Sequence, residues 1–282
     1  MQLNDEQINK LKLLENEMLR EVVRICDELH LEYYLIGGTL LGAVRHKGFI
    51  PWDDDIDIGL LRADYEVFIS RARDTLSHKM FLQNYTTDAD MIFPFTKIRY
   101  NNTTFIETRS KNSKMHQGVW IDVFPLDYYE MSSVKRKING FKKKLLNLRI
   151  AEEEYFEKSN NHSVPHIIAK KILTTIVHAR YPKLSDAVKK IDRINSSSRA
   201  CDIVINNCGA YLDKEAFPIS WIGSGTEVDF EFHTYRTFQE YDKYLKQIYG
   251  DYLTPPPIEK RVSVHDIEVI DLNNSYALYT KQ

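Results

Sequence analysis

Apolar residues recur at steps of three and four along residues 5–30, with charged residues between them. This spacing places the apolar side chains on one face and predicts an amphipathic helix, which Asn4 or Asp5 can cap. A short apolar run over residues 33–36 predicts a strand that ends at a glycine pair. Further helices are predicted over residues 39–45, 64–76 and 238–250.

Runs of aromatic and β-branched residues predict strands between these helices. We expect Asn101 and Asn102 to form a hairpin turn between two of the strands, and Pro125 to close another. The strands are predicted over residues 81–85, 95–100, 103–107 and 119–125, with more strand structure over 217–238.

Residues 132–210 differ from the rest, because they are rich in Lys, Arg and Ile and carry few strand signals. We interpret them as a helical insertion. The sequence therefore predicts an α+β fold with a mixed sheet flanked by helices. A core spans residues 1–131, and residues 211–282 complete the core and its site.

Composition narrows the class of protein. The 282 residues include 38 basic and 40 acidic residues, and a net charge of −2 gives no global attraction to nucleic acid. Three cysteines, Cys26, Cys201 and Cys208, are too few for a disulfide framework, which suggests a reducing compartment. No signal peptide or membrane-spanning stretch is visible, so the cytosol is the expected location.

Four carboxylates fill five positions over residues 53–57, between residues that favour burial. If residues 53–58 are extended, Asp55 and Asp57 share one face and can bind one divalent cation. Mg²⁺ prefers carboxylate oxygens and is usually completed by substrate phosphates. A solvated surface loop is the alternative, but the alternation with apolar residues favours a metal site.

Gly37, Gly38 and Thr39 precede this run and can bring backbone amides and a hydroxyl close to a phosphate. A plain strand-to-helix turn is the alternative. Asp122 lies on an apolar strand, where a carboxylate needs a cation or hydrogen-bond donors. It could join the metal, accept a proton from a hydroxyl, or cap the turn at residues 124–125.

Basic residues could surround the transferred phosphate. Arg45 and Lys97 can offset its charge, although any single one could also be an exposed surface residue. The run 142–144 predicts a solvated helix face, with an anionic membrane surface or a phosphate-linked glycan as alternative partners. His46 and His116 are interpreted as structural.

Ordered motifs across the chain resemble the LicD family of phosphotransferases, to which fukutin-type proteins are related. The resemblance lies in residues 37–46, 48–57, 120–127 and 249–257, and in His265. It implies a nucleotidyltransferase-like core in which Asp55 and Asp57 bind Mg²⁺ and Asp122 is the third carboxylate. Asp53 would contact the substrate or the metal ligands, and His265 would close the site from the C-terminal part.

The reaction implied by this resemblance is transfer of phosphocholine from CDP-choline to a sugar hydroxyl of a teichoic acid, lipooligosaccharide or capsule precursor. Gly37, Gly38 and Thr39 would hold the donor phosphate, with Arg45 and Lys97 balancing its charge. An aromatic cage would bind the choline, and its candidates are Trp52, Tyr85, Tyr100, Trp120 and Trp221. For most of these residues, packing in the core is the expected alternative.

Three alternatives remain open from the sequence. The donor could be CDP-glycerol or CDP-ribitol, the enzyme could leave a nucleotide on its acceptor, or the protein could be a non-catalytic binding protein. The acceptor could be lipid-linked, with the basic insertion at the inner face of the membrane.

Overall fold

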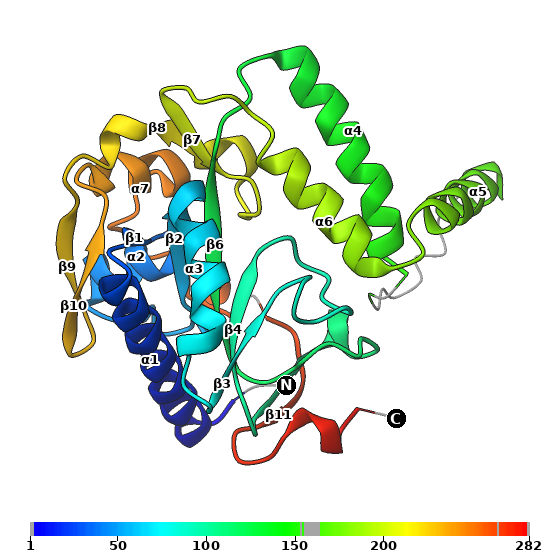
Figure 1. The fold of residues 1–282 in the computed structure, drawn as a ribbon. Helices are drawn as coiled ribbons and strands as arrows, with labels where there is room; N and C mark the ends of the chain where they lie inside the picture. The colour runs from blue at the N-terminus through cyan, green and yellow to red at the C-terminus, as the bar shows by residue number, and fades with distance from the viewer. Residues whose placement is uncertain (1–2, 153, 155–163, 264, 281–282) are drawn as a thin grey trace.

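The structure is a computed structural model that describes residues 3–152, 154, 164–263 and 265–280. In this part of the chain, seven α-helices surround a curled, mixed seven-stranded sheet (Figure 1). The mixed sheet with flanking helices agrees with the predicted combination of α and β structure.

The central sheet has the strand order β1-β2-β6-β4-β3, and β7 pairs with both β6 and β8. β2 and β6 run parallel, whereas the other neighbours are antiparallel. Its strands are β1 (Tyr33–Leu35), β2 (Asp57–Leu61), β3 (Met80–Gln83), β4 (Thr96–Tyr100), β6 (Trp120–Tyr128), β7 (Ile203–Asn206) and β8 (Ala216–Pro218).

Two long helices, α1 (Asp5–Glu28) and α3 (Arg62–Thr75), pack on the sheet beside each other (Figure 1). Asn4 caps α1 as predicted, because its side chain accepts a hydrogen bond from the Gln7 backbone N–H at 2.8 Å. The apolar face of α1 then joins the main core. The other helices are α2 (Gly37–His46), α4 (Ser133–Ile150), α5 (Val164–Arg180), α6 (Leu184–Asn195) and α7 (Tyr241–Tyr249).

The expected hairpin at Asn101 and Asn102 is wrong. These residues do turn the chain, but β5 (Thr104–Glu107) does not pair with β4. It pairs instead with β11 (Ile267–Asp271), near the end of the chain. β4 already has β3 and β6 on its two sides, so no edge of β4 is free for β5. A separate hairpin forms between β9 (Thr226–Phe230) and β10 (His233–Thr237).

Pro125 does not close its strand, because β6 continues through it to Tyr128. The Asp122 N–H donates to the carbonyl of Ile56, the residue just before β2, so by alternation the nitrogen of Pro125 faces the opposite side of β6. On that side the pairing with β4 ends at Val123 and the pairing with β7 begins at Leu126. The missing N–H of proline therefore breaks no ladder hydrogen bond.

The region predicted as an insertion contains α4, α5 and α6. Side chains of α4 and α6 build a second, smaller apolar core together with Met91, Ile92 and Met115. The same region includes β7, which extends the central sheet. Residues 153 and 155–163 of this region lie outside the described part of the chain. The division into three parts stays a prediction. No helix in the described part combines the length and apolarity needed to cross a membrane.

Candidate functional site

The acidic run alternates between cavity and core as predicted. Asp53, Asp55 and Asp57 are partly exposed and line the same cavity, whereas residues 54, 56 and 58 are buried. Of the three aspartates, only Asp57 lies within β2. Residues 53–56, which precede it, are not part of a strand. The period of two therefore begins before the strand itself.

The turn after β1 fixes the backbone of Asp57. Its N–H donates to Thr39 Oγ1 at 2.8 Å, and its carbonyl accepts from the Ile36 N–H at 3.2 Å. Gly37 has φ +55, and a Cβ there would lie 2.8 Å from Asp57 Oδ2. A Cβ on Gly38 would come equally close to Asp53 Oδ2. The two glycines thus allow two carboxylates to approach the first turn of α2.

Asp122 lies directly beside Asp57 in the parallel pairing of β2 with β6. On its other side it pairs with Lys97 of β4, whose Nζ donates to both carboxylate oxygens at 2.6 and 2.9 Å. Burial lowers the pKa of Lys97, and the Asp122 charge opposes this. Lys97 therefore contacts the site through Asp122 instead of projecting alone into the cavity.

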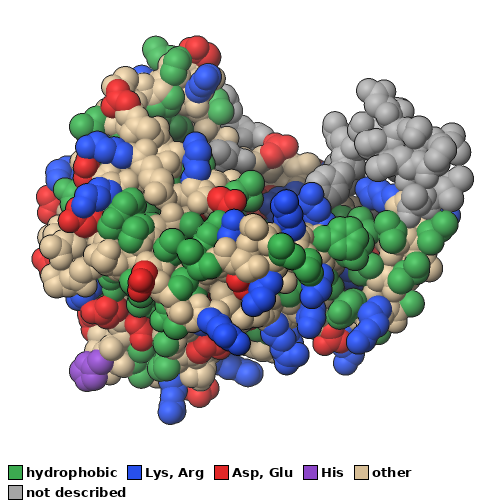
Figure 2. All heavy atoms as spheres, turned by 90° about the horizontal axis from the view of Figure 1, so that it is seen from above, with side chains coloured by type: hydrophobic (Ala, Val, Ile, Leu, Met, Phe, Trp, Pro, Cys, Tyr) green, Lys and Arg blue, Asp and Glu red, His purple; other side chains and the backbone are tan. Residues whose placement is uncertain are grey.

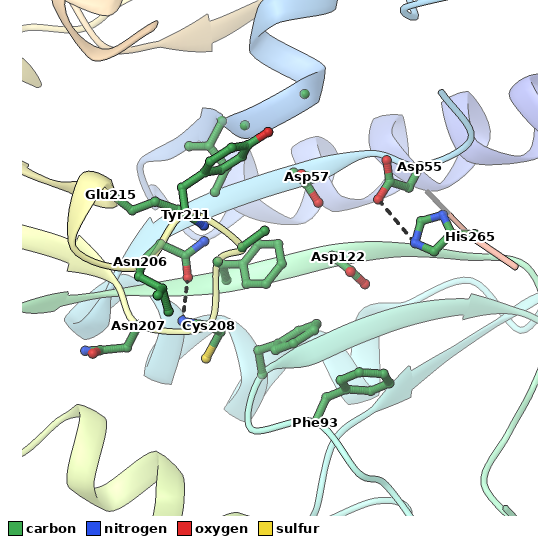
Figure 3. A pocket seen from close by; sticks show the side chains of 18 of the residues that line it. Asp55, Asp57, Phe93, Asp122, Asn206, Asn207, Cys208, Tyr211, Glu215 and His265 are labelled. Atoms are coloured by element: carbon green, nitrogen blue, oxygen red, sulfur yellow. Dashed lines mark hydrogen bonds and ion pairs between the residues drawn. The ribbon is translucent and has the colours of Figure 1, made fainter. Parts of the chain in front are cut away.

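His265 reaches the acidic run from the C-terminal part of the chain. Its Nδ1 lies 2.8 Å from Asp54 Oδ1, and its Nε2 lies 3.8 Å from Asp55 Oδ2 (Figure 3). Ser263 donates to the other oxygen of Asp54 at 2.7 Å. Burial disfavours the charged imidazole, but the Asp54 hydrogen bond and the charges of Asp55 and Asp54 outweigh it and raise the pKa of His265 to about 9.

The carboxylates facing the cavity are short of compensating charge. Burial, followed by the charges of neighbouring carboxylates, raises the pKa of Asp53 to about 7 and that of Asp57 well above its ordinary value. Burial also raises the pKa of Asp55 to about 6, although His265 opposes this. No hydrogen bond or ion pair joins the Asp57 carboxylate to another described residue. Such a set is electrostatically suited to a bound cation.

Glu15 of α1 lies behind this cluster and was not expected from the sequence. It is 1% exposed, and its Oε2 has no partner among the described residues. Burial and the charges of Asp55, Asp54 and Asp53 raise its pKa well above the ordinary value. The signal was present, because Glu15 stands four residues after Leu11 on the apolar face of the helix.

The cavity has a volume of about 1690 Å³. Of the residues proposed from the sequence, it brings together Gly37, Gly38, Arg45, Asp55, Asp57, Lys97, Asp122 and His265. Thr39 does not line it, since its hydroxyl holds the Asp57 backbone. Arg45 lies at the rim, where its guanidinium donates to the Tyr252 carbonyl at 2.9 Å and rests 5.9 Å from the Trp52 ring centre.

Most of the aromatic residues proposed for a cage lie elsewhere. Tyr85 donates to Asp192, Tyr100 donates to Glu17, and Trp120 is buried beside Lys97. Only Trp52 of that group lines the cavity. Other rings on the cavity wall were missed from the sequence: Phe93, Phe95, Phe124, Tyr211, Tyr249 and Tyr252.

The wall opposite the carboxylates is amide-rich and comes from the helical region and the loop after β7. Figure 3 shows Asn206, Asn207 and Tyr211 across the cavity from Asp55, Asp57 and Asp122. Helices α4 and α6 add Lys143, Lys144, Asn147 and Asn195. One end of the cavity is thus acidic, and the other carries amide and ammonium groups.

Comparisons with known proteins assign part of this chain to a family. Residues 30–161 match the family described as LicD/FKTN/FKRP, nucleotidyltransferase domain. Lipopolysaccharide cholinephosphotransferase LicD of Haemophilus influenzae is 27% identical over 257 residues, which cover 86% of this chain and 89% of that protein. Residues 30–161 carry a domain of the LicD family.

Two other similar proteins extend the family comparison. An uncharacterized protein of Rickettsia prowazekii is 37% identical over 151 residues, covering 47% of this chain and 54% of that protein. Human ribitol 5-phosphate transferase FKRP is 27% identical over 115 residues, covering 38% of this chain and 22% of that protein. The family match includes the whole acidic cluster but ends before α6 and His265.

The ligand atoms at this site determine which metal ion it could bind. Asp55 and Asp57 offer hard oxygen ligands toward the cavity, which suits Mg²⁺ completed by substrate phosphates. Within the described residues, no three His, Cys, Asp or Glu side chains form a cluster that would hold a metal ion by themselves. The arrangement fits a cation shared between two carboxylates and a substrate.

Proposed function

We propose that this protein is a Mg²⁺-dependent phosphotransferase that moves phosphocholine from CDP-choline to a sugar hydroxyl of a cell-surface glycan precursor. The observation that carries the proposal is the pair Asp55 and Asp57, which face the cavity and have no ion pair at hydrogen-bonding distance with any residue that the structure describes. The similarity to the LicD cholinephosphotransferase supports the choice of donor. The fold proposed for the core is nucleotidyltransferase-like, in keeping with the family description.

Asp55 and Asp57 would hold the cation, which offsets the negative charge of the pyrophosphate and of the leaving CMP. Asp122 would complete the acidic site, either as a third ligand or as the base that accepts the acceptor's proton. Its position is fixed by Lys97, which donates to both of its oxygens. Lys97 thus orients Asp122. Arg45 is more exposed than Lys97 and forms no ion pair with a described residue, so its charge would be available to the donor phosphate.

Each remaining group has a distinct task in this proposal. The acceptor oxygen forms a bond to the phosphorus next to choline while the bond from that phosphorus to CMP breaks. Gly38 would present its backbone N–H to the donor phosphate at the positive end of α2. Gly37, whose N–H donates to the Tyr244 hydroxyl at 3.4 Å, would allow the phosphate a close approach. Thr39 positions Asp57. His265, held by Asp54, closes the cavity beside Asp55.

The size and lining of the cavity suit the simultaneous binding of a donor and an acceptor. Small-ligand pockets usually measure roughly 300–1,000 Å³, so about 1690 Å³ leaves room for a donor and an acceptor. The aromatic faces of Phe124, Tyr211 and Tyr249 suit a quaternary ammonium group. The amide-rich wall suits the hydroxyl groups of a sugar.

A second candidate donor is CDP-ribitol. The similarity to ribitol 5-phosphate transferase FKRP favours it, as does the presence of Asn206 and Asn207 on the cavity wall. Amide side chains can donate to and accept from the hydroxyl groups of ribitol, whereas they give no advantage to choline.

The mass of the product separates these possibilities. The protein is incubated with Mg²⁺, lipooligosaccharide or teichoic acid, and CDP-choline, CDP-ribitol or CDP-glycerol in parallel. A glycan that gains phosphocholine, with release of CMP, is the expected result. Gain of ribitol phosphate would select the second donor, and gain of a nucleotide would overturn the proposed reaction. Failure of all donors with every glycan would favour a binding protein.

A further inference from the structure

Helix α4 presents an apolar stripe to solvent on the side away from the cavity. Met131, just before the helix, and Val134, Ile138 and Phe141 within it are 48–64% exposed. Their spacing of three and four residues places them on one face. Gly140, Lys143 and Asn147 lie about half a turn away and line the cavity. One helix therefore carries both a cavity wall and an unpartnered apolar face.

Lysines border this stripe on both sides. By helical spacing, Lys135 and Lys142 flank one side, whereas Lys137 flanks the other. Lys144 follows Lys137 on that second side and also lines the cavity. All four are exposed, and Lys137, Lys142 and Lys144 form no ion pair with a described residue. Figure 2 shows hydrophobic and basic side chains interspersed over the side of the molecule that carries the helical region.

The charge of α4 differs sharply from that of the whole chain. The helix has seven Lys and Arg residues and no Asp or Glu, although the complete chain has a net charge of −2. Helix α5 packs against α4 and has exposed apolar residues of its own: Ile172, Leu173 and Ile176. An apolar stripe bordered by lysines, with no acidic residue on the helix, matches the surface of an anionic bilayer.

We propose that α4 docks this protein on an anionic lipid surface, with Val134, Ile138 and Phe141 inserted among the headgroups and the bordering lysines on the lipid phosphates. The stripe spans about two turns, which suits shallow insertion in the interface and not crossing of the bilayer. Docking in this way brings one wall of the cavity near the membrane. The inference goes beyond the proposed function, because a lipid surface can be bound whatever reaction the cavity performs.

The test is cosedimentation of the full chain with vesicles. Binding is expected to vesicles of phosphatidylcholine and phosphatidylglycerol in equal parts, to be much weaker with phosphatidylcholine alone, and to fall with added salt. Phe141→Ser should weaken binding about tenfold. Lys137→Gln with Lys142→Gln should weaken it about fivefold per lysine. All these side chains are exposed, so circular dichroism should show an unchanged fold.

A matched control uses Phe232, which lies in the β9–β10 turn and is 87% exposed. Phe232→Ser should bind the mixed vesicles as the unchanged protein does. Equal loss in this control, or no binding to the mixed vesicles, would overturn the proposal. A concentration-dependent dimer that Phe141→Ser abolishes, without vesicle binding, would assign the stripe to a second copy of the chain and would also overturn it.

Discussion

His265 Nδ1 lies 2.8 Å from Asp54 Oδ1, although the two residues are 211 positions apart. Asp54 is buried behind the carboxylates that face the cavity, and Ser263 holds its second oxygen. This contact therefore joins the C-terminal part of the chain to the segment over residues 53–57 that carries the candidate metal ligands. Beyond it, β11 pairs with β5 and keeps His265 in place.

We expect His265→Gln to lower the rate of transfer by about 10–100-fold, since the cavity loses the group that closes it beside Asp55. Ser263→Ala is the matched control, because it removes hydrogen bonds to the same Asp54 carboxylate and from the His265 N–H but no group lining the cavity. It should retain most of the activity. Equal activity of His265→Gln and the unchanged protein would exclude the role assigned to His265.

In metal-free buffer, the stability that His265 contributes should depend on pH. The folded-state pKa of His265 is raised to about 9, above its ordinary value of 6.5. Its contribution is therefore complete below pH 6.5 and is lost as the pH rises through 9. The unfolding free energies of the unchanged protein and His265→Gln should differ by at most about 3 kcal/mol at low pH and converge above pH 9. A gap that widens with rising pH would contradict this assignment.

Glu15→Gln should stabilise the protein at neutral pH. Because burial raises the pKa of Glu15 well above 4.5, the folded protein keeps a proton that the unfolded chain has lost. Stability therefore falls as the pH rises above 4.5, and the neutral glutamine removes that loss. Urea unfolding should show a gain of at least about 1 kcal/mol at pH 7 that disappears by pH 4.

Glu17→Gln provides the control for this change. Glu17 lies on the same helix but is partly exposed and pairs with Lys79 at 2.9 Å. Its substitution should change stability little, because exposed ion pairs contribute about 0–1 kcal/mol. A loss of stability in Glu15→Gln at pH 7 would mean that the ionised carboxylate is required in the folded protein.

Lys97 and Asp122 should behave as one unit in a double-mutant cycle. Lys97→Met leaves the Asp122 carboxylate without its ammonium partner and should cost about 3–5 kcal/mol in metal-free buffer. Asp122→Leu should cost a similar amount by stranding the ammonium. The double variant should recover much of the loss, as seen in urea unfolding. Simple addition of the two losses would refute the coupling.

The sequence predicted the features that depend on local periodicity. The alternation over residues 53–58 follows from the two-residue period of extended chain, and it correctly placed Asp55 and Asp57 on the cavity side. The helix at the N-terminus follows from its apolar spacing and the Asn4 cap. These patterns need no knowledge of the partner segment.

Features that depend on a distant partner could not be predicted in this way. The strand over residues 104–107 pairs with residues 267–271, so nearby turn residues suggested the wrong hairpin. The partner of Lys97 became visible only when β4 lay beside β6. Pro125 is tolerated because two neighbouring strands end and begin around it. Glu15 was an exception, since its place on an apolar helix face was already visible.

The most direct test of the account is donor binding measured by thermal shift, with and without Mg²⁺, in the unchanged protein and in Asp57→Asn. Asp57→Asn should fold normally, because it neutralises a carboxylate that no described residue hydrogen-bonds. It should lose at least about 10²-fold in transfer rate.

CDP-choline at about 100 times its Kd should stabilise the unchanged protein by about 2.7 kcal/mol when Mg²⁺ is present. CMP should give a smaller shift, and Asp57→Asn should show no Mg²⁺-dependent part. Stabilisation by CDP-choline that is equal with and without Mg²⁺, or that is unchanged in Asp57→Asn, would contradict a donor site built on these carboxylates.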